Sequence, residues 1–210
     1  MGVWAGLGLK VLEPMAPAPS WPLPLLGPYI QRRVEELTAC RGLRVAVEPG
    51  EARESRRHRV LARLLGPDPV EVRRPDGKPE FAGSEVSLAH NGSVTFAVAS
   101  DRPLGCDVEA AEPETWRQLL GEERAALAAH VAETIGETPL LAAGRIWGAL
   151  EGLKKAGAAP DEPLRLREVT ADGWVLFHAG ARVVATYVHA RQDKRPLRFA
   201  VCVPAENGAR

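Results

Sequence analysis

The sequence carries no excess of charge of either sign. Its 27 Lys and Arg residues balance 27 Asp and Glu residues, so the formal net charge at pH 7 is zero. A chain without net charge creates no global attraction for a polyanion, which argues against nucleic acid as a partner. The charge is uneven in one place, residues 52–63 (ARESRRHRVLAR), where five arginines accompany a single glutamate. This stretch predicts a local basic patch.

Long apolar runs and paired cysteines are also lacking. No segment approaches the roughly 20 apolar residues of a membrane-spanning helix, and the first residues lack the basic-then-apolar order of a signal peptide. The three cysteines, Cys40, Cys106 and Cys202, are odd in number and widely separated. They indicate neither a disulfide framework nor a zinc site. We therefore expect a cytoplasmic protein with no membrane partner.

The composition is that of a folded globular chain, with 45% hydrophobic and 26% charged residues over 210 positions. Residues 11–28 contain six prolines, which argue against a regular helix or a central strand there. We expect residues 1–28 to form a proline-rich linker ahead of the folded region.

The rest of the chain predicts an α+β fold. Apolar spacing favours helices over 29–39, 56–65 and 113–135, and a further helix capped by Thr138, with Pro139 in its first turn, that closes at Gly157. Strands are expected over 85–90 and 93–100, joined by a turn at Asn91-Gly92, then over 104–109 and in a meander over 163–203. The prediction is a pair of comparable α+β halves, 29–102 and 103–210, each an antiparallel sheet packed with helices.

The segment LGCDVE, residues 104–109, aims two carboxylates in one direction. Strand side chains alternate, so Asp107 and Glu109 share a face while Cys106 and Val108 share the other. Like charges about 7 Å apart along a strand repel unless water, a cation or a basic group lies between them. The strand alone does not decide among these three, and the rest of the chain must be considered.

The helix over 139–157 supplies a third carboxylate. Glu151 and Lys155 are four residues apart and share a helix face. Taken alone, they are a solvated pair worth roughly 0.3–0.5 kcal/mol. Placed beside Asp107 and Glu109, Glu151 would complete an all-oxygen site for Mg²⁺, and Lys155 would attract the phosphates of a substrate.

Four motifs in order resemble those of the 4'-phosphopantetheinyl transferases of the surfactin-synthetase type. The motifs are Lys78-Pro79, SLAHNG (87–92), GCDVE (105–109) and WGALEGLKK (147–155). The family patterns are Gly-Lys-Pro, Ser-x-Ser-His-Ser-Gly, Gly-x-Asp-x-Glu and Trp-x-x-Lys-Glu-x-x-x-Lys. The likeness covers about residues 52–204.

This resemblance implies a fold and a reaction. Such enzymes are pseudo-twofold pairs of α+β halves that bind coenzyme A and Mg²⁺ in the cleft between them. They transfer the phosphopantetheine arm to a serine of an acyl carrier protein and release 3',5'-ADP. The metal ligands would be Asp107, Glu109 and Glu151, with Glu151 also accepting the serine proton and Lys155 lying on the pyrophosphate.

The resemblance also assigns residues to coenzyme A. His90 would bind a phosphate, Lys78 and Pro79 would border the adenine, and Arg59 would contact the 3'-phosphate. A lone histidine is more often a structural hydrogen-bonding residue, and its place in the motif favours the binding role. For Arg59, a solvated helix face is an equally good interpretation.

Three positions depart from the family pattern. Leu150 replaces the lysine before the helix glutamate, Ala89 replaces the second motif serine, and Asn91 replaces the serine after the histidine. Leu150 removes a cation from the phosphate site. Lys154 lies one turn further along the same helix edge, displaced by about 5.4 Å, and is a candidate to compensate.

The helix sequence GRIWGALEGLKKAG (144–157) is similar to that of the C-terminal transferase domains of enediyne-type iterative polyketide synthases. This likeness implies a role in polyketide biosynthesis and a carrier domain on the same polypeptide. Two alternatives stay open, a catalytically weak docking domain within a synthase and an unrelated Mg²⁺-dependent phosphohydrolase.

Overall fold

The computed structural model describes residues 22–73, 79–110, 115–191 and 194–205. The helices are α1 (Leu23–Thr38), α2 (Arg53–Leu65), α3 (Trp116–Ile135) and α4 (Pro139–Lys155). The strands of the first half are β1 (Arg44–Pro49), β2 (Glu71–Arg73), β3 (Pro79–Phe81), β4 (Glu85–Asn91) and β5 (Val94–Ser100). Those of the second half are β6 (Gly105–Glu109), β7 (Arg165–Val169), β8 (Val175–Ala179), β9 (Arg182–Arg191) and β10 (Lys194–Pro204).

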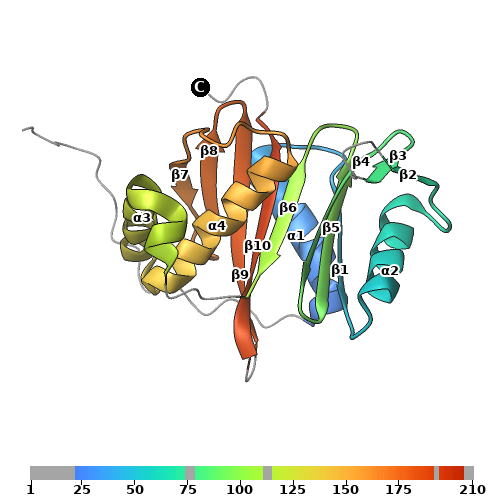
Figure 1. The fold of residues 1–210 in the computed structure, drawn as a ribbon, viewed down its shortest axis with the longest axis horizontal. Helices are drawn as coiled ribbons and strands as arrows, with labels where there is room; N and C mark the ends of the chain where they lie inside the picture. Colours follow the sequence, from blue (N-terminus) through green and yellow to red (C-terminus); the bar gives the residue numbers. More distant parts are fainter. Residues whose placement is uncertain (1–21, 74–78, 111–114, 192–193, 206–210) are drawn as a thin grey trace, which may run out of the picture.

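The strands form antiparallel sheets, in agreement with the α+β class. One sheet has the order β1-β5-β4, a second has the order β6-β10-β9-β8-β7, and β2 and β3 form a separate pair. As Figure 1 shows, α4 crosses one face of the five-stranded sheet and α2 lies beside the three-stranded sheet. Within the described part of the chain, no helix has the length and apolar character needed to cross a membrane.

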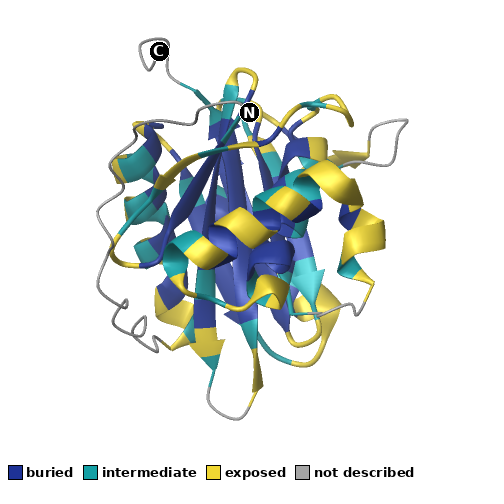
Figure 2. Ribbon diagram, turned by 90° about the vertical axis from the view of Figure 1, so that its left-hand side faces the viewer, coloured by how far each residue is buried: buried dark blue, intermediate teal, exposed yellow. Residues whose placement is uncertain are grey.

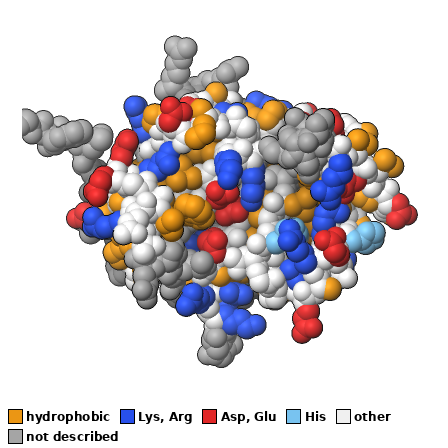
Figure 3. Space-filling model, in the orientation of Figure 1, with side chains coloured by type: hydrophobic (Ala, Val, Ile, Leu, Met, Phe, Trp, Pro, Cys, Tyr) orange, Lys and Arg blue, Asp and Glu red, His pale blue; other side chains and the backbone are white. Residues whose placement is uncertain are grey.

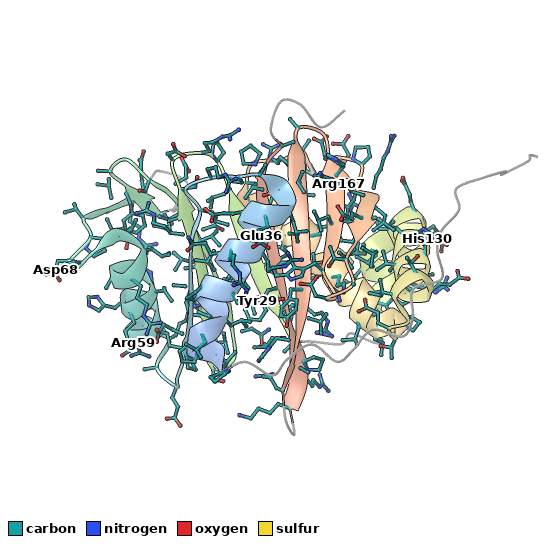
Figure 4. The ribbon with its side chains drawn as sticks, turned by 180° about the vertical axis from the view of Figure 1, so that it is seen from behind. Tyr29, Glu36, Arg59, Asp68, His130 and Arg167 are labelled. Atoms are coloured by element: carbon teal, nitrogen blue, oxygen red, sulfur yellow. The ribbon has the colours of Figure 1, made fainter. Side chains whose placement is uncertain are left out.

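The two sheets meet where β4 runs beside β6. The backbone N–H of Cys106 donates to the Ser87 hydroxyl at 3.0 Å, and the Cys106 thiol donates to the Ser87 carbonyl at 3.3 Å. Helix α1 covers this junction on the face opposite α4, as the view from behind shows (Figure 4). Its residues Leu26, Ile30 and Val34 are fully buried in a core that also contains side chains of β5, β6, β9 and β10.

The start of α1 corrects the prediction for residues 11–28. Residues 23–28 are helical although Pro24 and Pro28 lie among them; residues 11–21 lie outside the described residues. Pro24 is tolerated because first-turn N–H groups have no helical partner. Pro28 removes one hydrogen bond, and burial of the apolar face outweighs that loss.

Strand β1 was not predicted from the sequence. Its burial follows from helices on both faces, because Val45 and Val47 pack in the core under α1 while Ala46 packs with α2. The hairpin turn also differs by one residue from the prediction. Asn91 stays paired with Val94, so the two-residue turn is Gly92-Ser93, and Gly92 adopts a φ of +50°.

The C-terminal meander and α4 match their predictions. Thr138 caps α4 by accepting a hydrogen bond from the Leu141 N–H at 3.3 Å, and Pro139 lies in the first turn. The strands of the meander belong to the sheet on which α4 packs, and most residues of β8 and β10 are buried, as the dark blue interior in Figure 2 shows. This sheet and α4 together hold most of the candidate site.

Candidate functional site

Strand β6 and helix α4 approach each other unusually closely, because glycines lie at the contact. A Cβ atom on Gly105 would lie 1.9 Å from the Gly152 carbonyl oxygen and 2.8 Å from the Ala156 nitrogen. Further along α4, a Cβ on Gly148 would lie 3.9 Å from Asp107 Oδ2. The acidic face of β6 is therefore pressed against α4, which carries Glu151 and Lys155.

Asp107 is held by a cation. The Lys155 Nζ donates to Asp107 Oδ1 at 2.8 Å and to the Cys106 carbonyl at 3.0 Å. Burial raises the pKa of the Asp107 carboxyl, the Lys155 charge opposes this rise, and the charges of Glu109 and Glu151 add to it. Glu109 and Glu151 are thus close enough to Asp107 for their charges to act on its carboxyl.

Glu151 pairs with a different lysine. The Lys154 Nζ lies 3.6 Å from Glu151 Oε1, and the Lys154 side chain is 76% exposed. The isolated Glu151–Lys155 pair considered from the sequence is replaced by a cross-element pair, Lys155 with Asp107. In Figure 3, basic and acidic side chains lie close together on the face that carries α4.

Glu109 accepts hydrogen bonds from neutral donors. The Asn91 Nδ2 donates to Glu109 Oε1 at 2.8 Å, and the Ala110 N–H donates to the same oxygen at 2.7 Å. Asn91 ends β4 and Glu109 ends β6, so this bond joins the two sheets beside the site.

His90 lies one residue before Asn91 and is half-buried. Its Nδ1 is 2.8 Å from the Thr95 hydroxyl oxygen. Burial lowers the pKa of His90 to about 4. The positive charges of Arg53, Arg56 and Lys155 add to this lowering, and the negative charge of Glu54 opposes it. At neutral pH the ring is therefore uncharged. Charges on α2 and at the end of α4 both act on it.

The carboxylates of Asp107, Glu109 and Glu151 have the oxygen chemistry that Mg²⁺ prefers. Within the described ranges, no three His, Cys, Asp or Glu side chains gather closely enough to count as a preformed metal cluster. The acids fit the ion in donor type and in their shared negative charge.

A polar cleft of about 710 Å³ opens between the β3–β4 region and the C-terminal end of α4. Two of the predicted coenzyme A residues line it, Pro79 and Lys155, together with Ser87, Asp101 and Gly157. Lys78 lies outside the described residues. Lys155 therefore lines this cleft, and its ammonium binds Asp107.

Arg59 is not among the residues that line this cleft, and its hydrogen bonds go to β1. Its Nε donates to Glu48 Oε2 at 2.9 Å and its Nη2 to the Pro49 carbonyl at 3.2 Å, and Figure 4 labels it on α2. Arg63 binds the other oxygen of Glu48 at 2.6 Å. An anion bound at Arg59 would share the guanidinium with the buried carboxylate of Glu48.

The sequence did not single out Arg56, the most buried arginine of the basic stretch. It is 2% exposed and donates to the Gly50, Glu51 and Gly92 carbonyls and to the Thr95 hydroxyl. Arg56 thus fixes the turn of the β4–β5 hairpin against α2. The sequence alone does not distinguish Arg56 from the four other arginines of the same stretch.

An apolar cavity of about 220 Å³ lies on the other side of Glu109. Its lining residues are Glu109, Trp116, Leu119, Leu120, Leu140, Ala143, Gly144 and Trp147. Gly121 has a non-helical backbone (φ 75°, ψ 168°), so the first turn of α3 bends away from the rest of the helix. Two neighbouring leucines of α3 lie just before this bend, and Leu119 is half exposed whereas Leu120 is buried.

Comparison with known proteins adds no relative, because no protein-family model and no curated protein matches the chain.

Proposed function

We propose that the chain is a magnesium-dependent 4'-phosphopantetheinyl transferase that converts an apo acyl carrier protein to its holo form. The observation that carries the proposal is the Asp107–Lys155 pair of 2.8 Å at the edge of the polar cleft. It joins a cation suited to phosphate with a carboxylate that lies near two others. The order of the four sequence motifs supports the same reaction and a pseudo-twofold arrangement of the two halves.

In this proposal the nucleotide of coenzyme A lies in the polar cleft. Lys155 would contact the pyrophosphate and stabilise the charge that builds on the leaving phosphate. His90 would contribute a hydrogen bond to a phosphate, and Pro79 would border the adenine. Bound Mg²⁺, held by Asp107, Glu109 and Glu151, would neutralise phosphate charge.

The transfer forms one bond and breaks one. The serine oxygen of the carrier attacks the phosphorus that bears the pantetheine arm, and the bond from this phosphorus to the bridging oxygen of the pyrophosphate breaks. The serine proton passes to Glu151, and 3',5'-ADP leaves with the bridging oxygen. Glu151 suits this role because its side chain is 28% exposed and only loosely paired with Lys154.

The test is to incubate the chain with coenzyme A, Mg²⁺ and apo-carrier proteins and then to weigh the carriers. We expect a mass increase of one phosphopantetheine group, absent with a carrier whose serine is replaced by alanine. A metal chelator should abolish the gain. Full activity without divalent metal would disprove the role given to Asp107 and Glu109.

Two variants of adjacent lysines sharpen this test. Lys155→Met should lower the transfer rate by at least tenfold, because it removes the cation from the pyrophosphate. Lys154→Met is the matched control, since its side chain is mostly exposed, and it should transfer nearly normally. Equal losses in both would show that Lys154, not Lys155 alone, serves the phosphates.

The same assay separates the alternatives. Hydrolysis of coenzyme A without any carrier would indicate a phosphohydrolase. Binding of a carrier without any mass change would indicate a docking domain.

A further inference from the structure

The Asn91 amide ties the two sheets together at a carboxylate of the candidate site. Its Nδ2 donates to Glu109 Oε1 across 2.8 Å, from the last residue of β4 to the last residue of β6. The second donor to this oxygen is the Ala110 N–H at 2.7 Å. Two donors that converge on one oxygen fix the orientation of the carboxylate plane.

The amide donor is itself anchored. Asn91 precedes the Gly92-Ser93 turn, and the Gly92 carbonyl accepts a hydrogen bond from buried Arg56 Nη2 at 2.8 Å. Arg56 also donates to the Thr95 hydroxyl at 3.0 Å. The position of the amide is therefore set by a rigid hairpin end and not by a freely moving loop.

The two strand carboxylates are held by donors of different charge. Asp107 is held by the ammonium of Lys155, which offsets its negative charge. At Glu109 the two donors on Oε1 are the Asn91 amide and a backbone N–H, which orient the carboxylate. The orientation of Glu109 is therefore set by groups other than Lys155.

We propose that Asn91 is a positioning residue that orients Glu109 as a ligand for a divalent cation. The proposal rests on the proposed function, because that function gives Glu109 its cation. Through the same bond the hairpin that carries His90 is fastened to the strand that carries the acids. Groups that ligate a metal commonly depend on such partners, and loss of one typically weakens metal affinity 10- to 100-fold.

The experiment is a titration of the purified full chain with Mn²⁺, followed by electron paramagnetic resonance. Asn91→Leu keeps the side-chain volume and removes the donor, and we expect Mn²⁺ affinity to fall at least tenfold. Asn91→Ser, whose side chain is one atom shorter and cannot span the same distance, should also weaken binding. Ser93→Ala, in the turn of the same hairpin, is the matched control and should bind Mn²⁺ as the wild type does.

Two further measurements distinguish positioning from general damage to the fold. Affinity for 3',5'-ADP in the presence of a chelator should be unchanged in Asn91→Leu, because no metal is involved. In a double-mutant cycle with Glu109→Gln, the effect of Asn91→Leu on Mn²⁺ affinity should largely disappear, since its target is gone. Additive losses in the cycle, or weakened 3',5'-ADP binding without metal, would overturn the proposal.

The outcome also separates this inference from the proposed function. Unchanged Mn²⁺ affinity in both Asn91 variants, with normal binding by the wild type, would overturn only the role of Asn91. If the wild type binds no Mn²⁺ even with coenzyme A present, the metal-dependent function fails and this role fails with it.

Discussion

His90 carries a pH dependence that can be measured without any substrate. An unfolded histidine takes up its proton near pH 6.5, whereas burial and the nearby arginines lower the pKa of folded His90 to about 4. Between these values the unfolded state binds more protons. The stability gained from neutral His90 is therefore present above pH 6.5 and is lost as the pH falls toward 4.

We expect the wild type to lose about 1 kcal/mol more unfolding free energy than His90→Gln between pH 7.5 and pH 5, after allowance for solvent screening. Urea unfolding at both pH values measures the difference. Losses of unfolding free energy that arise from other titrating groups are the same in the two proteins and cancel in the comparison. Equal losses would mean that His90 titrates normally in the folded chain.

The contact between β6 and α4 gives a prediction at the scale of the element. Gly105→Ala would place a Cβ against the Gly152 carbonyl oxygen, so helix and strand must separate. We expect a destabilisation of about 3 kcal/mol, measured by chemical denaturation, and a matching loss of transfer as Lys155 moves away from Asp107.

Gly152→Ala is the control for this variant. Its Cβ would meet Cys202 Cβ at 3.7 Å and the Gly105 carbonyl oxygen at 3.9 Å, which are ordinary contacts, and alanine favours the helix by up to about 1 kcal/mol. We expect unchanged or slightly increased stability. A strongly destabilised Gly152→Ala would show that the whole contact, not Gly105 alone, excludes a side chain.

Two neighbouring leucines beside the bend in α3 lie in different environments, one exposed and one buried. Leu119 is 50% exposed, and Leu120 is 5% exposed. If the carrier docks here, Leu119→Asp should raise the carrier concentration needed for half-maximal transfer severalfold and leave coenzyme A affinity unchanged. Leu120→Asp should instead lower the melting temperature sharply, because it buries a charge. Normal carrier kinetics in Leu119→Asp would exclude this surface.

Elements with strong local signals were predictable from the sequence. The cap at Thr138, the helix that follows and the alternation in GCDVE all depend on neighbours in the chain, and the structure contains them, with Cys106 and Val108 in the core and Gly105 and Asp107 against α4. Strand β1 and the start of α1 were missed because their stability comes from burial between distant elements. The same reason explains why the bonds of Lys155 to Asp107 and of Asn91 to Glu109 were not foreseen.

At the scale of the whole molecule, one core joins the two predicted halves. Leu26, Ile30 and Val34 of α1 pack in the same cluster as Trp174 and Tyr187 of the C-terminal sheet. We expect residues 103–210 alone to lack a cooperative thermal transition by circular dichroism, because removal of α1 exposes this cluster. The full chain should show one transition that coincides by circular dichroism and tryptophan fluorescence. A fragment that melts cooperatively would indicate independent halves.

The position of α1 also constrains how the chain folds during synthesis. Tyr29 accepts a hydrogen bond from the Trp174 indole at 3.1 Å and donates to Asp172 at 3.4 Å, contacts that span 145 and 143 residues. A helix formed early on the ribosome can pack against β1, which follows it in the chain, but the part of its apolar face around Tyr29 is covered only when Trp174 and Tyr187 have been made. Contacts of such long sequence separation slow folding, and this uncovered part of the face is a natural binding surface for a chaperone until the last strands emerge.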